Sequence, residues 1–182
     1  MNIRLPLYVA DLVDDADRML ALSLVKHPAS GMPWKVIAND GSIARVVAPI
    51  IPANTIIYRK DEMGEYNLIF TPDVVSDLML DASKRHIPFD VSHSGLPIRN
   101  VDIIQSWQVD ESNGVGSGDY DAPVPDGTWM MMLQINLLGF SDVVREGWLE
   151  NFSGISISGR FSYDEISLHD AIDLYNLLNK QK

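Results

Sequence analysis

The apolar stretches of this sequence are short, and turn-forming residues separate them. The longest runs, such as residues 46–52, have the length of a β-strand, whereas a transmembrane helix needs about 20 apolar residues. Glycine, proline, asparagine or aspartate follows most of these runs. The pattern therefore argues against a membrane-spanning helix and favours a soluble chain built mainly of short strands.

Length and composition narrow the class of protein further. With 182 residues, the chain is expected to form one domain, residues 1–182, with its own hydrophobic core. The chain has 14 lysines and arginines and 25 aspartates and glutamates, a formal net charge of −11. This charge argues against nucleic acid or an anionic membrane as the main partner. The absence of cysteine excludes disulfides, thiolate zinc sites and a cysteine nucleophile. The first ten residues do not resemble a secretory signal.

The first 70 residues are predicted to be mostly β-structure. Residues 34–38 and 43–51 flank the turn signal Asn-Asp-Gly at 39–41, which predicts a hairpin. Two further strands are expected around the glycine-containing turn at 63–65. The apolar run at 19–25 fits a buried strand or a short helix.

The rest of the chain mixes strands with about three helices. Thr71 as N-cap and Pro72 at the first helical position predict a helix that ends before Pro88. Further strands are expected at 89–93, 101–109, 128–137 and 155–161, further helices at 141–148 and about 166–180, and a mobile loop at about 110–125. The elements do not alternate as in a βαβ protein, so we predict an α+β fold with a mostly antiparallel, β-barrel-like core.

Two residues have the chemistry of a nucleophile and its base. Ser156 lies between Gly154 and Gly159 where a helix is expected to give way to a strand, and glycines let backbone amides approach a developing oxyanion. His93 ends a short apolar strand, and imidazole is the side chain best suited to take a proton near neutral pH. A small strand serine packed beneath a helix and a capping histidine are the structural alternatives.

Other familiar sites fit less well. His86, Asp90 and His93 are close in sequence, but their spacing matches neither a helical metal-binding pair nor a zinc finger, so no metal site is predicted. Residues 110–121 start like a calcium loop but end on Asp121 in place of the closing glutamate. The glycines at 114–118 do not follow a clear strand, so they are not a dinucleotide-binding fingerprint.

Taken in order, several segments between residues 20 and 161 resemble the bacteriophage prohead (procapsid maturation) proteases. The similarity lies in Leu-Ser-Leu-Val-Lys-His-Pro-Ala at 22–29, Ile-Pro at 51–52, Ile-Tyr-Arg at 57–59, Gly-Glu-Tyr at 64–66, His93, Ile-Gln-Ser-Trp at 104–107, Val-Pro-Asp-Gly-Thr-Trp at 124–129, Arg-Glu-Gly at 145–147 and Gly-Ile-Ser-Ile-Ser-Gly-Arg-Phe at 154–161. Each segment is loose by itself, and the ordered set is more specific than any one of them.

The resemblance implies a serine endopeptidase with the fold of the herpesvirus assemblins. His93 would match the catalytic histidine, Ser156 the nucleophile, and amides near Gly154 or Gly159 the oxyanion site, with no cofactor. The implied partners are the phage scaffold and major capsid protein inside the procapsid, in the bacterial host cytoplasm, with self-association left open.

The sequence departs from the family in two places. In the family the serine usually comes six residues after the glycine of the helix end; here that spacing from Gly147 falls on Ser153, so Ser153 is the alternative nucleophile. Relatives tend to carry glutamate in the strand after the histidine, where this chain has Gln105. In a trypsin-like triad an acid-to-amide change costs about 10⁴ in rate. Either Asp102, Asp110 or another acid substitutes for it, or the chain is slow or inactive.

Two other classes of function stay open from the sequence. A catalytically degenerate structural, scaffold or internal head protein on the same fold would explain Gln105 and the shifted serine spacing. A generic acidic binding module with an accidental resemblance is a third possibility. The closing amphipathic helix at about 166–180 is predicted to pack on the core.

Overall fold

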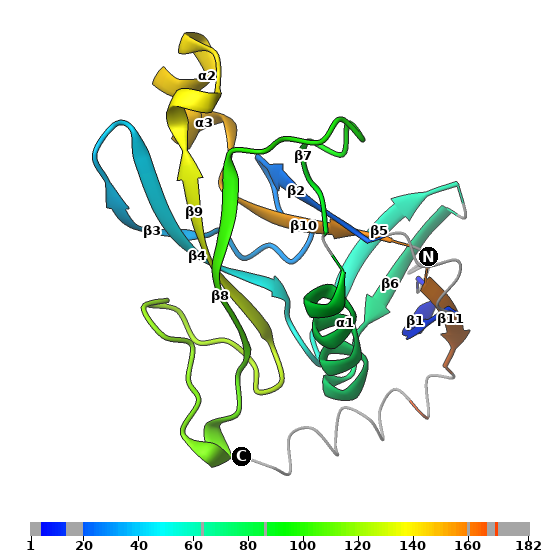
Figure 1. Ribbon diagram of the computed structural model, residues 1–182. Coiled ribbons are helices and arrows are strands. Elements are labelled where there is room, and N and C mark those ends of the chain that lie inside the picture. The colour runs from blue at the N-terminus through cyan, green and yellow to red at the C-terminus, as the bar shows by residue number, and fades with distance from the viewer. Residues whose placement is uncertain are drawn as a thin grey trace.

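The computed structural model describes residues 5–13, 20–62, 64–85, 87–159, 161–166 and 170. In this part of the chain eleven strands form three sheets, and three α-helices accompany them (Figure 1). The strands are β1 (Leu7–Leu12), β2 (Ala21–Val25), β3 (Lys35–Asn39), β4 (Ile43–Ile51), β5 (Ile57–Asp61), β6 (Gly64–Ile69), β7 (Phe89–Val91), β8 (Val101–Gln108), β9 (Trp129–Asn136), β10 (Gly154–Ser158) and β11 (Phe161–Glu165). The helices are α1 (Pro72–Lys84), α2 (Asp142–Glu146) and α3 (Trp148–Asn151).

The strand orders are β11-β1-β6-β5, β10-β2-β7 and β3-β4-β9-β8. The pairs β1–β6 and β2–β7 are parallel and the other six are antiparallel, which confirms a mostly antiparallel α+β fold. A barrel-like core is not what the described residues form, because the three sheets stay separate and none of them closes on itself. The three sheets instead pack against one another, as Figure 1 shows.

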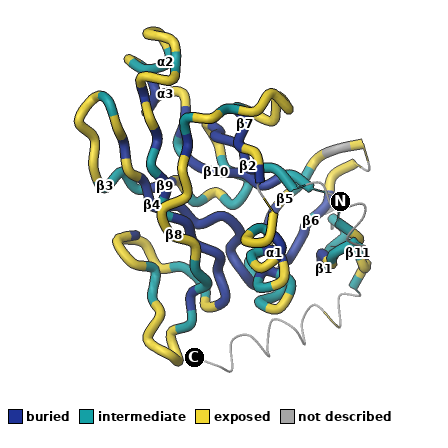
Figure 2. Tube along the Cα trace, in the orientation of Figure 1, coloured by how far each residue is buried: buried dark blue, intermediate teal, exposed yellow. Residues whose placement is uncertain are grey.

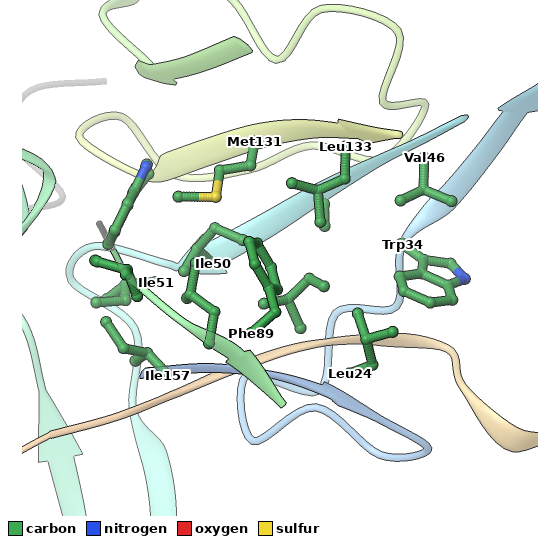
Figure 3. Packing of buried hydrophobic residues seen from close by; sticks show 14 of the residues in the cluster. Leu24, Trp34, Val46, Ile50, Ile51, Phe89, Met131, Leu133 and Ile157 are labelled. Atoms are coloured by element: carbon green, nitrogen blue, oxygen red, sulfur yellow. The ribbon is translucent and has the colours of Figure 1, made fainter. Parts of the chain in front are cut away.

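The core lies between the three-stranded sheet and the sheet that contains β4 and β9. Figure 3 shows Leu24, Phe89 and Ile157 of the three-stranded sheet directed toward Met131 and Leu133 of β9. All five side chains are buried, and burying an aliphatic or aromatic side chain contributes about 1.5–3 kcal/mol. Because side chains alternate along a strand, the residues between these apolar ones face the other side of the three-stranded sheet.

Most of the predicted strands form where the sequence places them. The hairpin β3–β4 turns at residues 39–42, and β5 and β6 pair around the turn that includes position 64. The run at 19–25, for which a strand and a helix were both open, contains β2. Strand β1, at the start of the described chain, was not predicted, because its alternation is weak and acidic residues follow it closely.

Helix α1 begins and ends as its sequence predicts. The Thr71 hydroxyl accepts a hydrogen bond from the Val74 backbone N–H, and Pro72 occupies the first turn. Val75 and Leu78 are buried, and the helix packs against β1, β8 and β9. Its last turn is closed by the Arg85 N–H, which donates to the Asp81 carbonyl.

Two predicted elements are divided in the structure. The helix expected at 141–148 is two short helices, α2 and α3, which meet at Gly147, the residue with the lowest helix propensity apart from proline. The strand expected at 155–161 is two strands in different sheets, β10 and β11. The helix expected at 166–180 lies outside the described residues except for Ile166 and Asp170.

The segment predicted as a mobile loop, residues 110–125, is irregular and is fastened to the sheet at several points. It contains one 3₁₀ turn at Glu111–Asn113. The buried Tyr120 hydroxyl donates to the Pro33 carbonyl at 2.8 Å, and the Trp107 indole N–H donates to the Gly116 carbonyl at 3.0 Å. None of the helices in the described part of the chain has the length and apolarity to cross a membrane.

Candidate functional site

Three polar side chains form a row across the three-stranded sheet. Ser23 is the middle residue of β2, and its register partners are Ser156 on β10 and Asp90 on β7. Register partners on adjacent strands point to the same side of a sheet, so all three side chains share the face opposite the core. Each of them is flanked along its own strand by apolar residues that face inward, which fixes the row in place.

The row is completed by His93, two residues after β7. Its Nδ1 lies 3.0 Å from the Ser23 Oγ, and the same Oγ is hydrogen-bonded to Asp90 Oδ1. Ser23 is completely buried and Asp90 nearly so, whereas His93 is exposed. A solvent-facing imidazole is thus connected to a buried carboxylate through one hydroxyl.

The backbone that carries His93 has an uncommon conformation. Ser92 and His93 both have positive φ, 52° and 57°, in the left-handed region that residues with a Cβ seldom adopt. Three hydrogen bonds hold this turn: Ser92 N–H to Leu24 O, Ser94 N–H to Val91 O, and Gly95 N–H to Asp90 Oδ2. Such conformations cost about 1–3 kcal/mol each and cluster at functional sites.

Ser156 stands beside this network without a bond to it. Ser156 is 5% exposed, and its hydroxyl makes no hydrogen bond within the described residues. Adjacent strands are about 4.8 Å apart, so Ser156 lies within one strand spacing of Ser23, the residue that the imidazole contacts. Its hydroxyl proton is not committed to a protein acceptor in the part of the chain that the structure describes.

Ser153, the alternative nucleophile, is used differently. Its Oγ donates to the Lys26 carbonyl at 2.6 Å, and its own carbonyl accepts from the Trp34 N–H. These bonds fasten the start of β10 to the segment after β2. The placement of the two serines therefore favours Ser156, whose side chain lies in the row.

The three residues considered as partners of the imidazole lie elsewhere. Gln105 and Asp102 are exposed on β8, the edge strand of another sheet. Figure 2 draws much of β8 as exposed. Asp110 caps the 3₁₀ turn, and hydrogen bonds from Ser112 and Asn113 lower the pKa of its carboxyl. Within the described residues no hydrogen bond joins any of these three side chains to His93.

Sequence reasoning missed Ser23 and Asp90 as members of the site. The signal was present as alternation: Leu-Ser-Leu at 22–24 and Phe-Asp-Val at 89–91 each place one polar residue between two inward-facing apolar ones. What the sequence does not contain is the order β10-β2-β7, which brings the two strands side by side.

The two glycines near Ser156 have unequal surroundings. A Cβ on Gly154 would lie 2.6 Å from Pro28 Cγ, so close packing against the proline ring already requires glycine there. Gly159 follows the end of β10 and is partly exposed. In the described residues no cluster of three or more histidine and acidic side chains has the geometry of a metal site, and His86 lies outside them.

No protein-family model, no curated protein and no solved structure matches this chain.

Proposed function

We propose that the chain is a serine endopeptidase of the phage prohead-maturation type, with Ser156 as nucleophile and His93 as general base. The observation that carries the proposal is the row Ser156, Ser23, Asp90 with His93 against Ser23, because three strands and the turn after β7 bring four chemically suited residues to one face. The resemblance assigns the same two residues, His93 and Ser156, from a different line of argument.

The proposed chemistry is an acyl transfer in two steps. The Ser156 Oγ attacks the scissile carbonyl while His93 takes its proton, and the proton then passes to the leaving amine as the C–N bond breaks. Water next attacks the acyl ester and gives a proton to His93. His93 returns this proton to the Ser156 oxygen as the ester bond breaks. Backbone amides near Gly154 or Gly159 would stabilise the oxyanion in both steps.

The substrates and setting of this proposal come from the resemblance alone. They are segments of the phage scaffold and major capsid protein, cleaved inside the procapsid in the bacterial host cytoplasm. The fold is proposed to be related to that of the herpesvirus assemblins. No cofactor takes part in the proposed mechanism.

A second candidate function is a structural or internal head protein on the same fold. It is favoured by one observation, that His93 is hydrogen-bonded to Ser23 and not to the serine proposed as nucleophile. Hydrogen bonds between nucleophile and base are often long before substrate binds, so this contact pattern is compatible with both functions.

The test is cleavage of the co-expressed scaffold and major capsid protein, followed by mass spectrometry. The variants are His93→Ala, Ser156→Ala and, as matched control, Ser158→Ala, which removes a hydroxyl two residues further along β10. Cleavage by the wild type and by Ser158→Ala, with loss in both site variants, supports the protease. Intact partners with the wild type under assembly conditions support the structural protein.

A further inference from the structure

We propose that Ser23 and Asp90 are positioning residues for His93, in which the Asp90 carboxylate acts on the imidazole through the Ser23 hydroxyl. The kinetic part of this inference rests on the proposed function, whereas the part about the imidazole tautomer does not. This relay of Asp90, Ser23 and His93 would supply the acid that Gln105 does not supply.

The number of protons on the three groups determines the direction of the relay. An ionised carboxylate only accepts hydrogen bonds, so the single Ser23 hydroxyl proton goes to Asp90 Oδ1. The Ser23 Oγ is then an acceptor toward His93, and the Nδ1 atom 3.0 Å away must carry the ring proton. The neutral imidazole is therefore the Nδ1–H tautomer, with its lone pair on Nε2.

That tautomer is the one a general base needs. A free lone pair on Nε2, directed away from the anchored Nδ1, can take the proton of a serine hydroxyl. When the imidazole becomes charged, the buried carboxylate stabilises it through the polarised hydroxyl. In this arrangement Asp90 has the role of a triad acid, displaced by the length of one hydroxyl.

Burial explains why Ser23 acts as relay and not as nucleophile. Ser23 is 0% exposed, with β10 on one side and β7 on the other, so no substrate carbonyl reaches its Oγ. Water is excluded from the bond between Ser23 and Asp90 for the same reason, which keeps these two side chains paired. The second Asp90 oxygen accepts from the Gly95 N–H at 2.9 Å and fixes the carboxylate in its plane.

A purely structural role for the pair predicts something different. If Ser23 and Asp90 only stabilised the turn at 91–95, their removal would lower stability and leave the tautomer of His93 unchanged. The tautomer is therefore the decisive observable, and it can be read without any enzymatic activity.

The experiment is ¹⁵N NMR of the histidine rings in the full chain, with His93→Gln used to assign the His93 signals among those of the four histidines. In the wild type we expect neutral His93 to be protonated on Nδ1. Ser23→Ala and Asp90→Asn are expected to shift it toward the mixture of a free imidazole, while Ser23→Thr, which keeps a hydroxyl, and Ser158→Ala keep the wild-type tautomer. A wild-type His93 protonated on Nε2 overturns the proposal, even if every variant fails to fold.

Kinetics separate this inference from the proposed function. If the chain cleaves its substrate, Ser23→Ala and Asp90→Asn should lower kcat by about 10²-fold or more with little change in KM. Unchanged kcat in both folded variants overturns the relay and leaves the protease standing. If the wild type cleaves nothing but shows the Nδ1–H tautomer with the expected response to Ser23→Ala, the protease fails and the relay stands.

Discussion

Ser156 and Ser23 are directly opposed in the antiparallel pair β10–β2, although they are 133 positions apart in the sequence. One hydroxyl is committed to a buried carboxylate and the other is uncommitted within the described chain. Two serines with nearly the same burial therefore differ in the hydrogen bonds of their hydroxyl groups. The hydrogen-bond partners, and not the residue type, determine which of them has a proton available to leave.

The bond of Ser153 to the Lys26 carbonyl predicts that this serine is dispensable for cleavage. Ser153→Ala should keep the cleavage pattern of the wild type, because the hydroxyl acts on the backbone between β2 and β10 and not on the imidazole. It should lower stability by about 0.5–1.5 kcal/mol, the usual net value of such a bond. Mass spectrometry and urea unfolding measure the two effects. Loss of cleavage in a folded Ser153→Ala protein, with Ser156→Ala active, would reverse the assignment of the nucleophile.

The contact between Gly154 and Pro28 predicts a steric cost for any side chain at position 154. Gly154→Ala places a Cβ 2.6 Å from Pro28 Cγ, and the proline ring has little freedom to move away. Overpacking of this kind costs about 1–3 kcal/mol. Gly116→Ala is the control, because its added Cβ meets only Glu111 Oε1, at 3.7 Å. Equal stability of the two variants in urea unfolding would contradict the packing argument.

The local parts of the fold were predictable, and their pairing was not. The hairpin at 39–41 and the start of α1 at Thr71 depend on neighbouring residues, so turn and capping chemistry predicts them from the sequence. The division between β10 and β11 depends on their partner strands β2 and β1, which are distant in the sequence. No local signal shows that the chain leaves one sheet for another within two residues.

The candidate site shows the same limit. His93 and Ser156 were predicted from their local setting and from the resemblance, and the structure places both at the same three-stranded sheet. Ser23 and Asp90 were missed, because a serine or aspartate in a short apolar strand gains meaning only when the neighbouring strand is known. Gln105, the position expected for the third member, lies on β8 in another sheet.

The turn between β3 and β4 predicts an acid-sensitive contribution to stability. Asp40 Oδ1 accepts from the Ser42 and Ile43 N–H groups at 2.8 and 2.7 Å, and these hydrogen bonds, that of Ile43 first, hold the pKa of Asp40 below its ordinary value. The unfolded chain therefore binds a proton more readily than the folded one as the pH falls. The stabilisation is present above the unfolded pKa of about 3.9 and is lost as the pH falls through the lower folded pKa.

Asp40→Asn tests this contribution, because it keeps an acceptor oxygen and removes the charge. We expect the wild type to be the more stable protein near neutral pH and the difference to shrink below about pH 4, measured by urea unfolding at constant ionic strength. Asp119→Asn is the control, since Asp119 is exposed and makes no hydrogen bond among the described residues. A difference that stays constant with pH would show that the charge of Asp40 has no part in the turn.

Tyr120 makes the corresponding prediction at alkaline pH. Burial raises the pKa of its hydroxyl, which donates to the Pro33 carbonyl at 2.8 Å and fastens the irregular segment 110–125 to the start of β3. Tyr120→Phe keeps the ring and removes the bond, so it should cost about 1 kcal/mol below pH 9. Tyr163→Phe, a half-buried tyrosine whose hydroxyl has no hydrogen bond in the described part of the chain, should cost less.

The sign of the pH effect follows from the raised pKa. The folded state keeps the phenol proton longer than the unfolded state, so the contribution of Tyr120 is complete below the unfolded pKa of about 10 and declines as the pH rises through the folded value. The wild type should therefore lose its advantage over Tyr120→Phe above about pH 10. If the wild type instead keeps the same advantage at every pH, the phenol ionises equally in both states. The stabilisation from the hydrogen bond to Pro33 would then not depend on the charge of Tyr120.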